Sequence, residues 1–465
     1  MAQGHKDRLS AVDASFLHEE RESSHMHVGA VVILDGPPPS RDEFVEHLES
    51  RLHLVPRYRQ KLSFPRFQAG RPFWIDDPRF NLDYHVRHSA LPAPGGIGQL
   101  RELAGRVFSQ RLDRSKPLWE IWLVQGLEDD RFALLSKTHH ALVDGVSGVD
   151  IATVLFDLTA ATAPAPSPDV AWTPAPEPSQ AELIGEGVKS LIRTPARIGE
   201  GLLEAARDPT RALDFARGAV EGVSEVAWAG LNPAPDVPLN VPIGPHRRVY
   251  WAESELADLK AVKNGLGGTV NDVFLAAVAG ALAQWLQSRG IRTEGMELRG
   301  LVPVSIRPKG QEGQLGNQIA ALRGPLPVYA EDPVERLQIV REAMEGVKES
   351  KQALGAEVIS GLEDFAPPTI LAMAARLNFS TRLFNLIVTN VPGPQFPLFL
   401  MGREMRQIVP VAFLPDRHAL AIAAMSYNGK LDFGLLGDYD AMPDLDRLAE
   451  YFQASLAELV SASPS

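Results

Sequence analysis

At 465 residues the chain is longer than one typical domain, and we expect two domains that each bury a hydrophobic core. Its 46 basic and 58 acidic residues give a net charge of −12, which argues against nucleic acid as a partner and against simple attraction to an anionic membrane. The absence of cysteine excludes disulfides, a thiolate metal site and an acyl-enzyme formed on a thiol.

The first part of the chain, residues 1–160, alternates strand-like and helical patterns. Apolar runs at 28–34 and 119–124 predict strands, and the spacing of apolar residues at 99–111 predicts a helix between them. This alternation is typical of an α/β domain.

Two adjacent histidines, His139 and His140, follow the apolar run 132–135 and precede Asp144 and Gly145. The pattern predicts a strand, a tight turn and the start of a helix, with the histidines placed to reach a cleft. A neutral imidazole has a pKa near the working pH, so it can accept a hydroxyl proton and later pass it to a leaving group. Such general base catalysis is worth about 10²–10⁴-fold in rate.

The same residue types also occur in two other kinds of site. Histidines and an aspartate can bind a metal ion, but a metal site usually has three or four protein ligands, and the sequence has no HExxH pattern. A serine nucleophile would be expected in a GxSxG turn, which Gly145-Val146-Ser147-Gly148 does not form. We therefore expect neither a metal nor a serine nucleophile.

The middle of the chain, residues 161–245, is predicted to be a Pro-rich linker with a helical insert. Six prolines lie between Pro164 and Pro178, residues 181–230 have apolar residues at helical spacing, and a second proline cluster follows at 233–245. The insert has no basic excess, which disfavours binding to an anionic membrane surface. An apolar contact with a neutral lipid droplet stays open.

The last part, residues 246–465, is predicted to be a second α/β region, with strands at 299–304, 384–389, 419–425 and 431–436. The longest apolar run, Val273–Ala283, has 11 residues, whereas a membrane span needs about 20. The start of the chain has no apolar core of the signal-peptide type. We therefore expect a cytoplasmic protein without a transmembrane segment, whose contact with the inner membrane face or with lipid bodies would be peripheral.

The HHxxxDG pattern resembles the active-site motif of CoA-dependent acyltransferases. Further segments resemble motifs of the bacterial wax ester synthase/diacylglycerol acyltransferases: Leu9–Phe16, His25–Gly29, Pro117–Glu120, Asn271–Val273, Val302–Arg307, Gly316-Asn317 and Thr389–Pro394. They occur in that family's order and extend over most of the chain, and condensation domains would not be expected to share the whole set. The chain is identified as a member of this family by resemblance.

The resemblance implies two chloramphenicol-acetyltransferase-like domains, at 1–160 and 246–465, with the active site in a channel between them. It implies an acyl-CoA-dependent O-acyltransferase that makes triacylglycerol from diacylglycerol, or wax ester from a long-chain alcohol. Transfer would be direct, with acyl-CoA as co-substrate and no metal. In this family the second histidine is the base, which here is His140, and the catalytic motif also contains His139, Asp144 and Gly145. Asp144 and Gly145 shape the turn, and Arg307 is a candidate partner for Asp144.

Four other residues are candidates for substrate binding or structural support. Trp119 beside a strand is typical of a core anchor. Asn271 and Asp272 precede an apolar helix and can be explained as a helix cap. Asn390 could donate a hydrogen bond near the acyl carbonyl, or its segment could simply form a turn.

Three alternatives to this function stay open. The first is transfer to other lipid alcohols, the second is the use of carrier-bound thioesters, and the third is a non-catalytic protein that binds lipid droplets.

Overall fold

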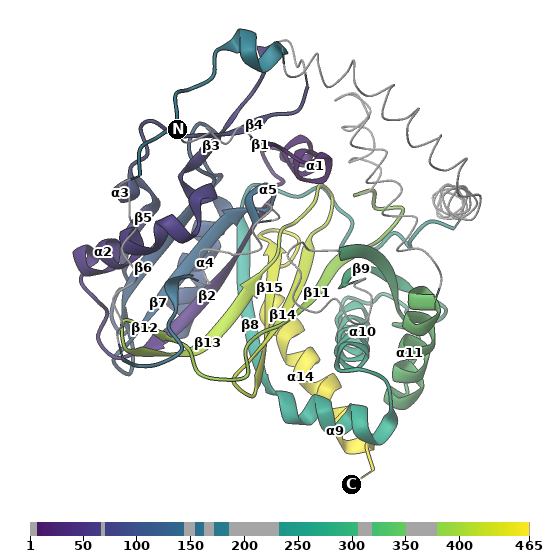
Figure 1. Ribbon diagram of the computed structural model, residues 1–465. Coiled ribbons are helices and arrows are strands. Elements are labelled where there is room, and N and C mark those ends of the chain that lie inside the picture. The colour runs from purple at the N-terminus through teal and green to yellow at the C-terminus, as the bar shows by residue number, and fades with distance from the viewer. Residues whose placement is uncertain are drawn as a thin grey trace, which may run out of the picture.

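The computed structural model describes residues 7–66, 70–143, 154–161, 172–185, 232–305, 319–349 and 379–464. Within these ranges the chain forms two six-stranded sheets and a small three-stranded sheet. The two large sheets lie beside each other, with helices on their outer sides (Figure 1). This is the mixed α/β, two-domain architecture that the sequence predicts.

The N-terminal sheet has the order β12-β13-β2-β7-β6-β5. Its strands from the first part of the chain are β2 (His27–Asp35), β5 (Val86–Ala90), β6 (Trp119–Leu127) and β7 (Arg131–His139). Its helices are α1 (Ala11–Glu19), α2 (Arg41–Arg51), α3 (Leu82–His85), α4 (Ile97–Ser109) and α5 (His140–Val143). The predicted strands at 28–34 and 119–124 and the predicted helix at 99–111 match β2, β6 and α4, so these predictions are confirmed.

A small sheet, with the order β1-β4-β3, lies near the N-terminal end of the described chain. Its strands are β1 (Asp7–Arg8), β3 (Gln60–Ser63) and β4 (Phe73–Asp76), and two short 3₁₀ turns, Leu52–Leu54 and Pro56–Arg59, connect α2 to β3.

The C-terminal sheet has the order β10-β9-β11-β14-β15-β8. Its strands are β8 (Arg247–Glu255), β9 (Leu298–Ser305), β10 (Ile319–Leu326), β11 (Leu386–Pro392), β14 (Leu420–Tyr427) and β15 (Lys430–Asp438), and its helices are α9 (Leu256–Leu266), α10 (Val270–Ser288), α11 (Pro333–Glu349) and α14 (Leu445–Ala462). The four strands predicted for this region coincide with β9, β11, β14 and β15.

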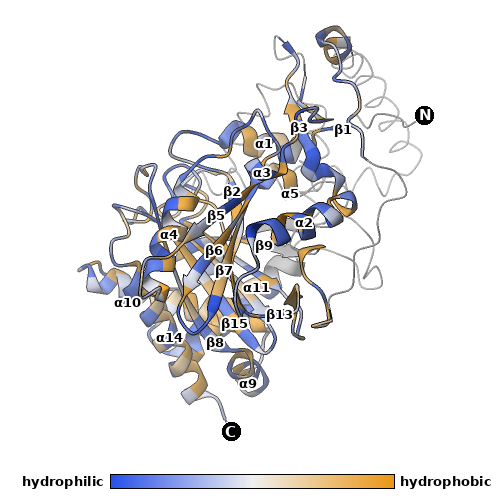
Figure 2. Ribbon diagram, turned by 90° about the vertical axis from the view of Figure 1, so that its left-hand side faces the viewer, coloured by the Kyte–Doolittle hydropathy of each residue, from blue (hydrophilic) through white to orange (hydrophobic). Residues whose placement is uncertain are grey.

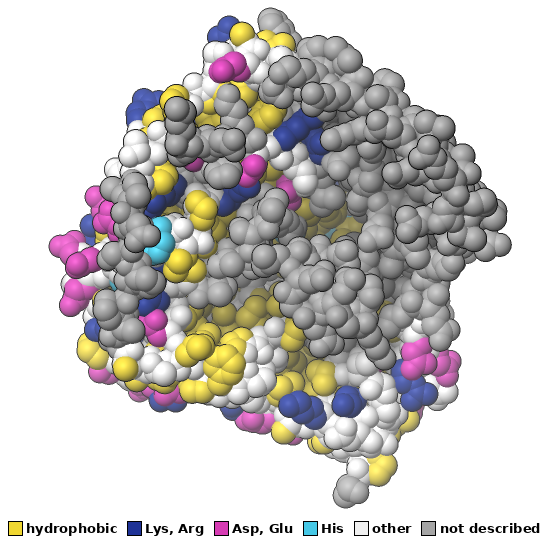
Figure 3. Space-filling model, viewed as in Figure 1, with side chains coloured by type: hydrophobic (Ala, Val, Ile, Leu, Met, Phe, Trp, Pro, Cys, Tyr) yellow, Lys and Arg dark blue, Asp and Glu magenta, His cyan; other side chains and the backbone are white. Residues whose placement is uncertain are grey.

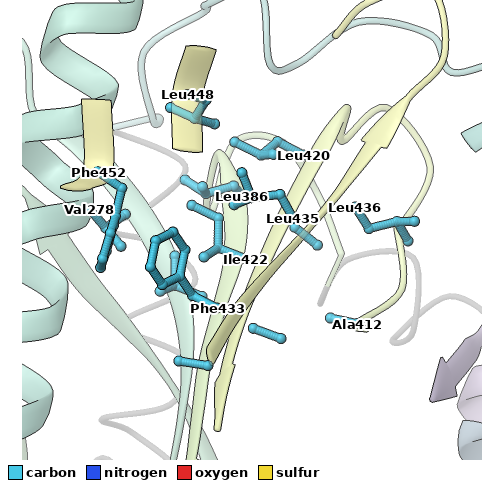
Figure 4. Close-up of a cluster of buried hydrophobic side chains, with 14 of the residues drawn as sticks. Val278, Leu386, Ala412, Leu420, Ile422, Phe433, Leu435, Leu436, Leu448 and Phe452 are labelled. Atoms are coloured by element: carbon cyan, nitrogen blue, oxygen red, sulfur yellow. The ribbon is translucent and has the colours of Figure 1, made fainter. Parts of the chain in front are cut away.

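The core of this half lies between the sheet and the helices α10 and α14. Figure 4 shows Phe433 of β15 directed toward Phe452 of α14 and Val278 of α10, and the two phenylalanine ring centroids are 3.8 Å apart. The apolar run Val273–Ala283 is buried inside α10, which explains its composition as that of a core helix. Figure 2 likewise shows hydrophobic residues along the strands around β7 and hydrophilic residues on outer helices.

Two strands from the C-terminal half cross into the N-terminal sheet. They are β12 (Phe399–Leu400) and β13 (Arg403–Val411), and β13 pairs antiparallel with β2. Where β13 passes β15, a Cβ on Gly434 would lie 2.0 Å from the carbonyl oxygen of Pro410, so only glycine permits this approach. The crossing joins the two sheets.

The division of the chain into domains at residues 160 and 245 stays a prediction, because most of the segment between them lies outside the described residues.

A second junction joins α4 to β8. The guanidinium of Arg101 lies 3.6 Å from the ring centroid of Tyr250 and donates a hydrogen bond to the carbonyl oxygen of Trp251. Arg247 donates to the carbonyl oxygen of Ser23 in the N-terminal half. These contacts hold the two halves against each other through partly buried polar groups.

In the described part of the chain, no single helix has the length and apolar composition of a membrane span. Within this part, only the pair α9 and α10 taken together has that length and composition, and the two helices meet at a bend of 100°.

Candidate active site

The adjacent histidines lie where β7 ends and α5 begins. The backbone N–H of His139 donates to the carbonyl oxygen of Leu118 (N···O 2.9 Å), and that of His140 donates to the carbonyl oxygen of Met26 (N···O 2.8 Å). The segments before β6 and β2 therefore hold the strand end from both sides. Three separate sequence motifs, those around Leu118, Met26 and the histidines, meet at this point.

The imidazole of His140 is half-buried among aromatic rings. The ring of Phe16 stacks on it, with centroids 4.0 Å apart and planes 24° apart, and the ring of Phe413 meets it edge-on at 5.5 Å. The ring of Phe379 lies 6.1 Å from Phe16 and 5.9 Å from Phe413. Phe16 comes from α1, whereas Phe413 and Phe379 come from the C-terminal half, so His140 lies at the junction of the two halves.

His139 has a different position from His140, since its side chain points into the protein interior and is fully buried. Its Nδ1 accepts a hydrogen bond from the backbone N–H of Ala141 (N···N 3.1 Å), so the ring proton is on Nε2, which lies 3.7 Å from a carboxylate oxygen of Glu20. Burial lowers the pKa of His139, and the nearby Glu20 opposes that shift. His139 is thus enclosed at the end of β7, between the backbone of Ala141 and the carboxylate of Glu20.

Glu20, which directly follows α1, is a buried carboxylate that the sequence did not single out. It lies 3.6 Å from Nε2 of His27, and Nε of Arg114 donates to it (N···O 2.5 Å). Burial raises the pKa of Glu20, but the neighbouring His139 and His27 and the charge of Arg114 outweigh this and hold the pKa well below its usual value. Burial also lowers the pKa of His27 to about 3. The low pKa of Glu20 keeps it ionised beside this neutral imidazole.

Trp119 is a core residue at the start of β6. Its indole N–H donates to the carbonyl oxygen of Tyr58 (N···O 2.7 Å), and its ring stacks on His85 with centroids 4.5 Å apart. It is 1 % exposed. These contacts explain the Pro-Leu-Trp motif as packing that fixes the start of β6, where Trp119 pairs with Thr138 of β7 next to the histidines.

Asn271 and Asp272 lie in the first turn of α10, and Thr269 is the residue that caps this helix. The backbone N–H of Asp272 donates to the Thr269 hydroxyl, and the Asp272 carboxylate accepts from the backbone N–H of Thr269. The side-chain amide of Asn390 on β11 donates to the Asn271 carbonyl oxygen (N···O 3.3 Å). Asp272 thus completes a capping box, and Asn271 links the helix to the Thr389–Pro394 motif.

Three of the predicted site residues, Asp144, Gly145 and Arg307, lie outside the described residues. Among the residues that the structure describes, no group of three or more His, Asp or Glu side chains could hold a metal ion.

Sequence comparison decides the family. The profile of the wax ester synthase/diacylglycerol acyltransferase catalytic domain matches residues 9–274, and that of the C-terminal domain of the same family matches residues 315–460. The chain belongs to the wax ester synthase/diacylglycerol acyltransferase family. The family assigned from the motifs is therefore confirmed, and Phe16, Glu20 and His140 all lie in the span matched by the catalytic domain.

Known members of the wax ester synthase/diacylglycerol acyltransferase family align along nearly the whole chain. A Mycobacterium tuberculosis protein named as a probable diacylglycerol O-acyltransferase is 33% identical over 463 residues, which cover 98% of this chain and 96% of that protein. The structure of a wax ester synthase/diacylglycerol acyltransferase from Marinobacter aquaeolei superimposes with a TM-score of 0.66 at 29% identity, covering 97% of this chain and 98% of that one.

More distant acyltransferases share the fold with this member of the family. A trichothecene 15-O-acetyltransferase from Fusarium sporotrichioides superimposes with a TM-score of 0.61 at 15% identity, covering 98% of this chain and 95% of that one. At this identity the likeness concerns the fold alone.

Proposed function

We propose that this acyltransferase moves a long-chain acyl group from acyl-CoA directly to the hydroxyl of diacylglycerol, which yields triacylglycerol, or of a long-chain alcohol, which yields a wax ester. The observation that carries the proposal is the position of His140. It is a half-buried imidazole at a strand end, between rings from both halves of a chain that belongs to an acyltransferase family.

His140 serves as the general base in this reaction. As the acceptor oxygen attacks the thioester carbon, the imidazole takes the hydroxyl proton and a tetrahedral oxyanion forms. The C–S bond then breaks, the ester is released, and the departing CoA thiolate takes the proton from the imidazolium. No acyl-enzyme forms, and the reaction requires two co-substrates and no metal.

The other predicted residues support this step. His139 fixes the end of β7, and Asp144 with Gly145 shapes the turn after α5, with Arg307 as the partner of Asp144. Asn390 has one of two roles: it donates a hydrogen bond to the acyl carbonyl, or it holds β11 against α10 through its side-chain hydrogen bond to Asn271. Trp119 and Asp272 act through packing and helix capping.

The acceptors are insoluble in water, so the enzyme would meet them at a lipid surface. Figure 3 shows hydrophobic side chains gathered on the face over β13. A backbone bridge between Asp157 and Phe399 brings the 69% exposed Leu158 beside the segment that holds the 49% exposed Phe396. With a net charge of −12, contact with a membrane or a lipid droplet would be apolar and peripheral.

The test is CoA release from palmitoyl-CoA in the presence of hexadecanol or dipalmitoylglycerol, measured for the wild type and for His140→Ala. We expect acceptor-dependent release that falls at least about 10²-fold in His140→Ala. His88→Ala, which removes an exposed histidine from β5, is the matched control and should retain full activity. Undiminished release by His140→Ala would show that this histidine is not the base.

A further inference from the structure

We propose that α1 is the element that positions the catalytic imidazole, with Phe16 fixing the plane of the His140 ring and Glu20 anchoring the end of the helix. This inference rests on the proposed role of His140 as the base. Helix α1 lies directly beside α5 (Figure 1), and both residues come from it or from the position that caps it.

The stacking contact defines how the imidazole is oriented. Of the two aromatic contacts of His140 described above, only that of Phe16 is face-to-face, and it covers one side of the ring. Rotation of the imidazole about its Cβ–Cγ bond would break this contact. The lone pair of an imidazole nitrogen lies in the plane of the ring, so fixing this plane fixes the direction from which the acceptor hydroxyl must approach.

Hydrogen bonds hold Phe16 in place along the helix. The backbone N–H of Glu20 donates to the carbonyl oxygen of Phe16 (N···O 3.0 Å), which closes the last turn of α1. The guanidinium of Arg114 donates both to the carbonyl oxygen of Leu17 (N···O 2.8 Å) and to the carboxylate of Glu20. A single arginine therefore binds the backbone of the helix and its capping residue.

The carboxylate of Glu20 connects this helix to the two central strands. It lies within 4 Å of Nε2 of His27 on β2 and of Nε2 of His139 on β7. His139 precedes His140 in the chain. A displacement of Glu20 would therefore shift His139 and change the position of the adjacent His140. The side chain of Glu20 is 1% exposed, and a carboxylate so deeply buried stays ionised only while its cationic and N–H neighbours compensate for lost hydration.

The alternative is that Phe16 only fills the core. In that case Phe16→Leu would lower stability without changing turnover. If Phe16 positions the base, Phe16→Leu should lower kcat about tenfold, the value expected for the loss of one aromatic pair, with KM for palmitoyl-CoA unchanged. Phe16→Tyr keeps the ring and should restore most of kcat.

Two further variants complete the kinetic test. Phe44→Leu makes the same change at a fully buried position of α2 and should keep the wild-type kcat. Glu20→Gln keeps the shape of the side chain and removes its charge, so it should lower kcat without raising KM, even where Phe16→Leu does not fold.

A second readout does not depend on activity. In a protein with ¹³C-labelled histidine, the His140 signal is identified by its loss in His140→Ala, and stacking on Phe16 should shift its ring protons upfield. We expect this shift to vanish in Phe16→Leu and to persist in Phe44→Leu.

The two readouts separate this inference from the proposed function. An active His140→Ala would contradict the role of His140 as the base, whatever the spectra show. An inactive His140→Ala, combined with wild-type kcat in Phe16→Leu and Glu20→Gln and an unmoved His140 signal, would overturn the positioning role of α1 alone.

Discussion

The side-chain amide of Asn390 on β11 donates a hydrogen bond to the side-chain carbonyl of Asn271 in the first turn of α10, with an N···O distance of 3.3 Å. The two residues belong to separate sequence motifs, 119 positions apart in the chain. The bond ties the start of a buried core helix to a strand of the C-terminal sheet, so each motif has a structural reason for its asparagine.

This pair predicts a specific coupling. Asn271→Ala and Asn390→Ala should each lower the free energy of unfolding by about 1 kcal/mol, because each leaves a partly buried amide without its partner. The double variant should lose little more than either single variant, because the same bond is removed only once. Urea unfolding of the four proteins measures this, and fully additive losses would show that the bond contributes nothing.

The sequence predicts local elements well, because they depend on residues close together in the chain, whereas the roles of the residues in the HHxxxDG motif stay a prediction. The strands β9, β11, β14 and β15 follow from continuous apolar runs, and the prediction that Trp119 is an anchor is consistent with its burial. The crossing strand β13 could not be predicted in the same way. Its nine residues include three charged side chains and Pro410, and its partner β2 is more than 350 residues away in the chain.

At the site, the burial of Glu20 could not be predicted from the sequence either. It stands among charged residues, Glu19-Glu20-Arg21, a run that is typical of an exposed helix end. Its burial depends on Arg114, His27 and His139, which only the folded chain brings to it. The stacking of Phe16 on His140 is likewise a tertiary contact, and no spacing in the sequence indicates it.

Two glycines in α4 should respond in opposite ways to alanine. A Cβ on Gly105 would lie 2.8 Å from the carbonyl oxygen of Arg247, at the junction with β8, whereas a Cβ on Gly98 would meet nothing within 4 Å. Gly105→Ala should therefore destabilise the protein by about 1–3 kcal/mol, as overpacking does. Gly98→Ala should stabilise it by up to about 1 kcal/mol through helix propensity. Thermal unfolding of both variants is the measurement, and equal effects would contradict the tight α4–β8 contact.

Lys137 on β7 provides a test of a buried ion pair. Its ammonium lies 2.6 Å from the carboxylate of Glu120 and donates to the carbonyl oxygens of Val107 (2.8 Å) and Gln110 (2.9 Å). Burial lowers the pKa of Lys137, and Glu120 opposes that shift. Lys137→Met should lower the free energy of unfolding by about 3–5 kcal/mol, because Glu120 is left charged and without its counter-ion.

The double variant Lys137→Met/Glu120→Gln gives the control for that prediction. Removing the unpaired charge of Glu120 should recover part of the lost free energy of unfolding, although the carbonyl groups of Val107 and Gln110 still lack their donor. If the double variant is less stable than Lys137→Met, the loss does not come from the unpaired carboxylate.

Asp432 on β15 should make stability depend on pH. Its side chain is 1% exposed, and the amide of Gln407 on β13 donates to it (N···O 2.6 Å). Burial raises the pKa of Asp432 to about 7, although the hydrogen bond from Gln407 opposes the shift. Its reference value is 3.8, so between these two values the folded state holds a proton that the unfolded state has lost.

The sign of the effect follows from that difference. Below about pH 4 the carboxyl is protonated in both states, and its stabilising contribution is fully present; it is lost as the pH rises through about 7. Asp432→Asn keeps the shape and has no proton to lose, so its stability relative to the wild type should increase between pH 4 and pH 8. The increase should be on the order of 3–4 kcal/mol, since one pKa unit corresponds to about 1.4 kcal/mol. Urea unfolding of both proteins at several pH values measures it, and a difference that stays constant over this range would show that Asp432 ionises alike in the folded and unfolded chain.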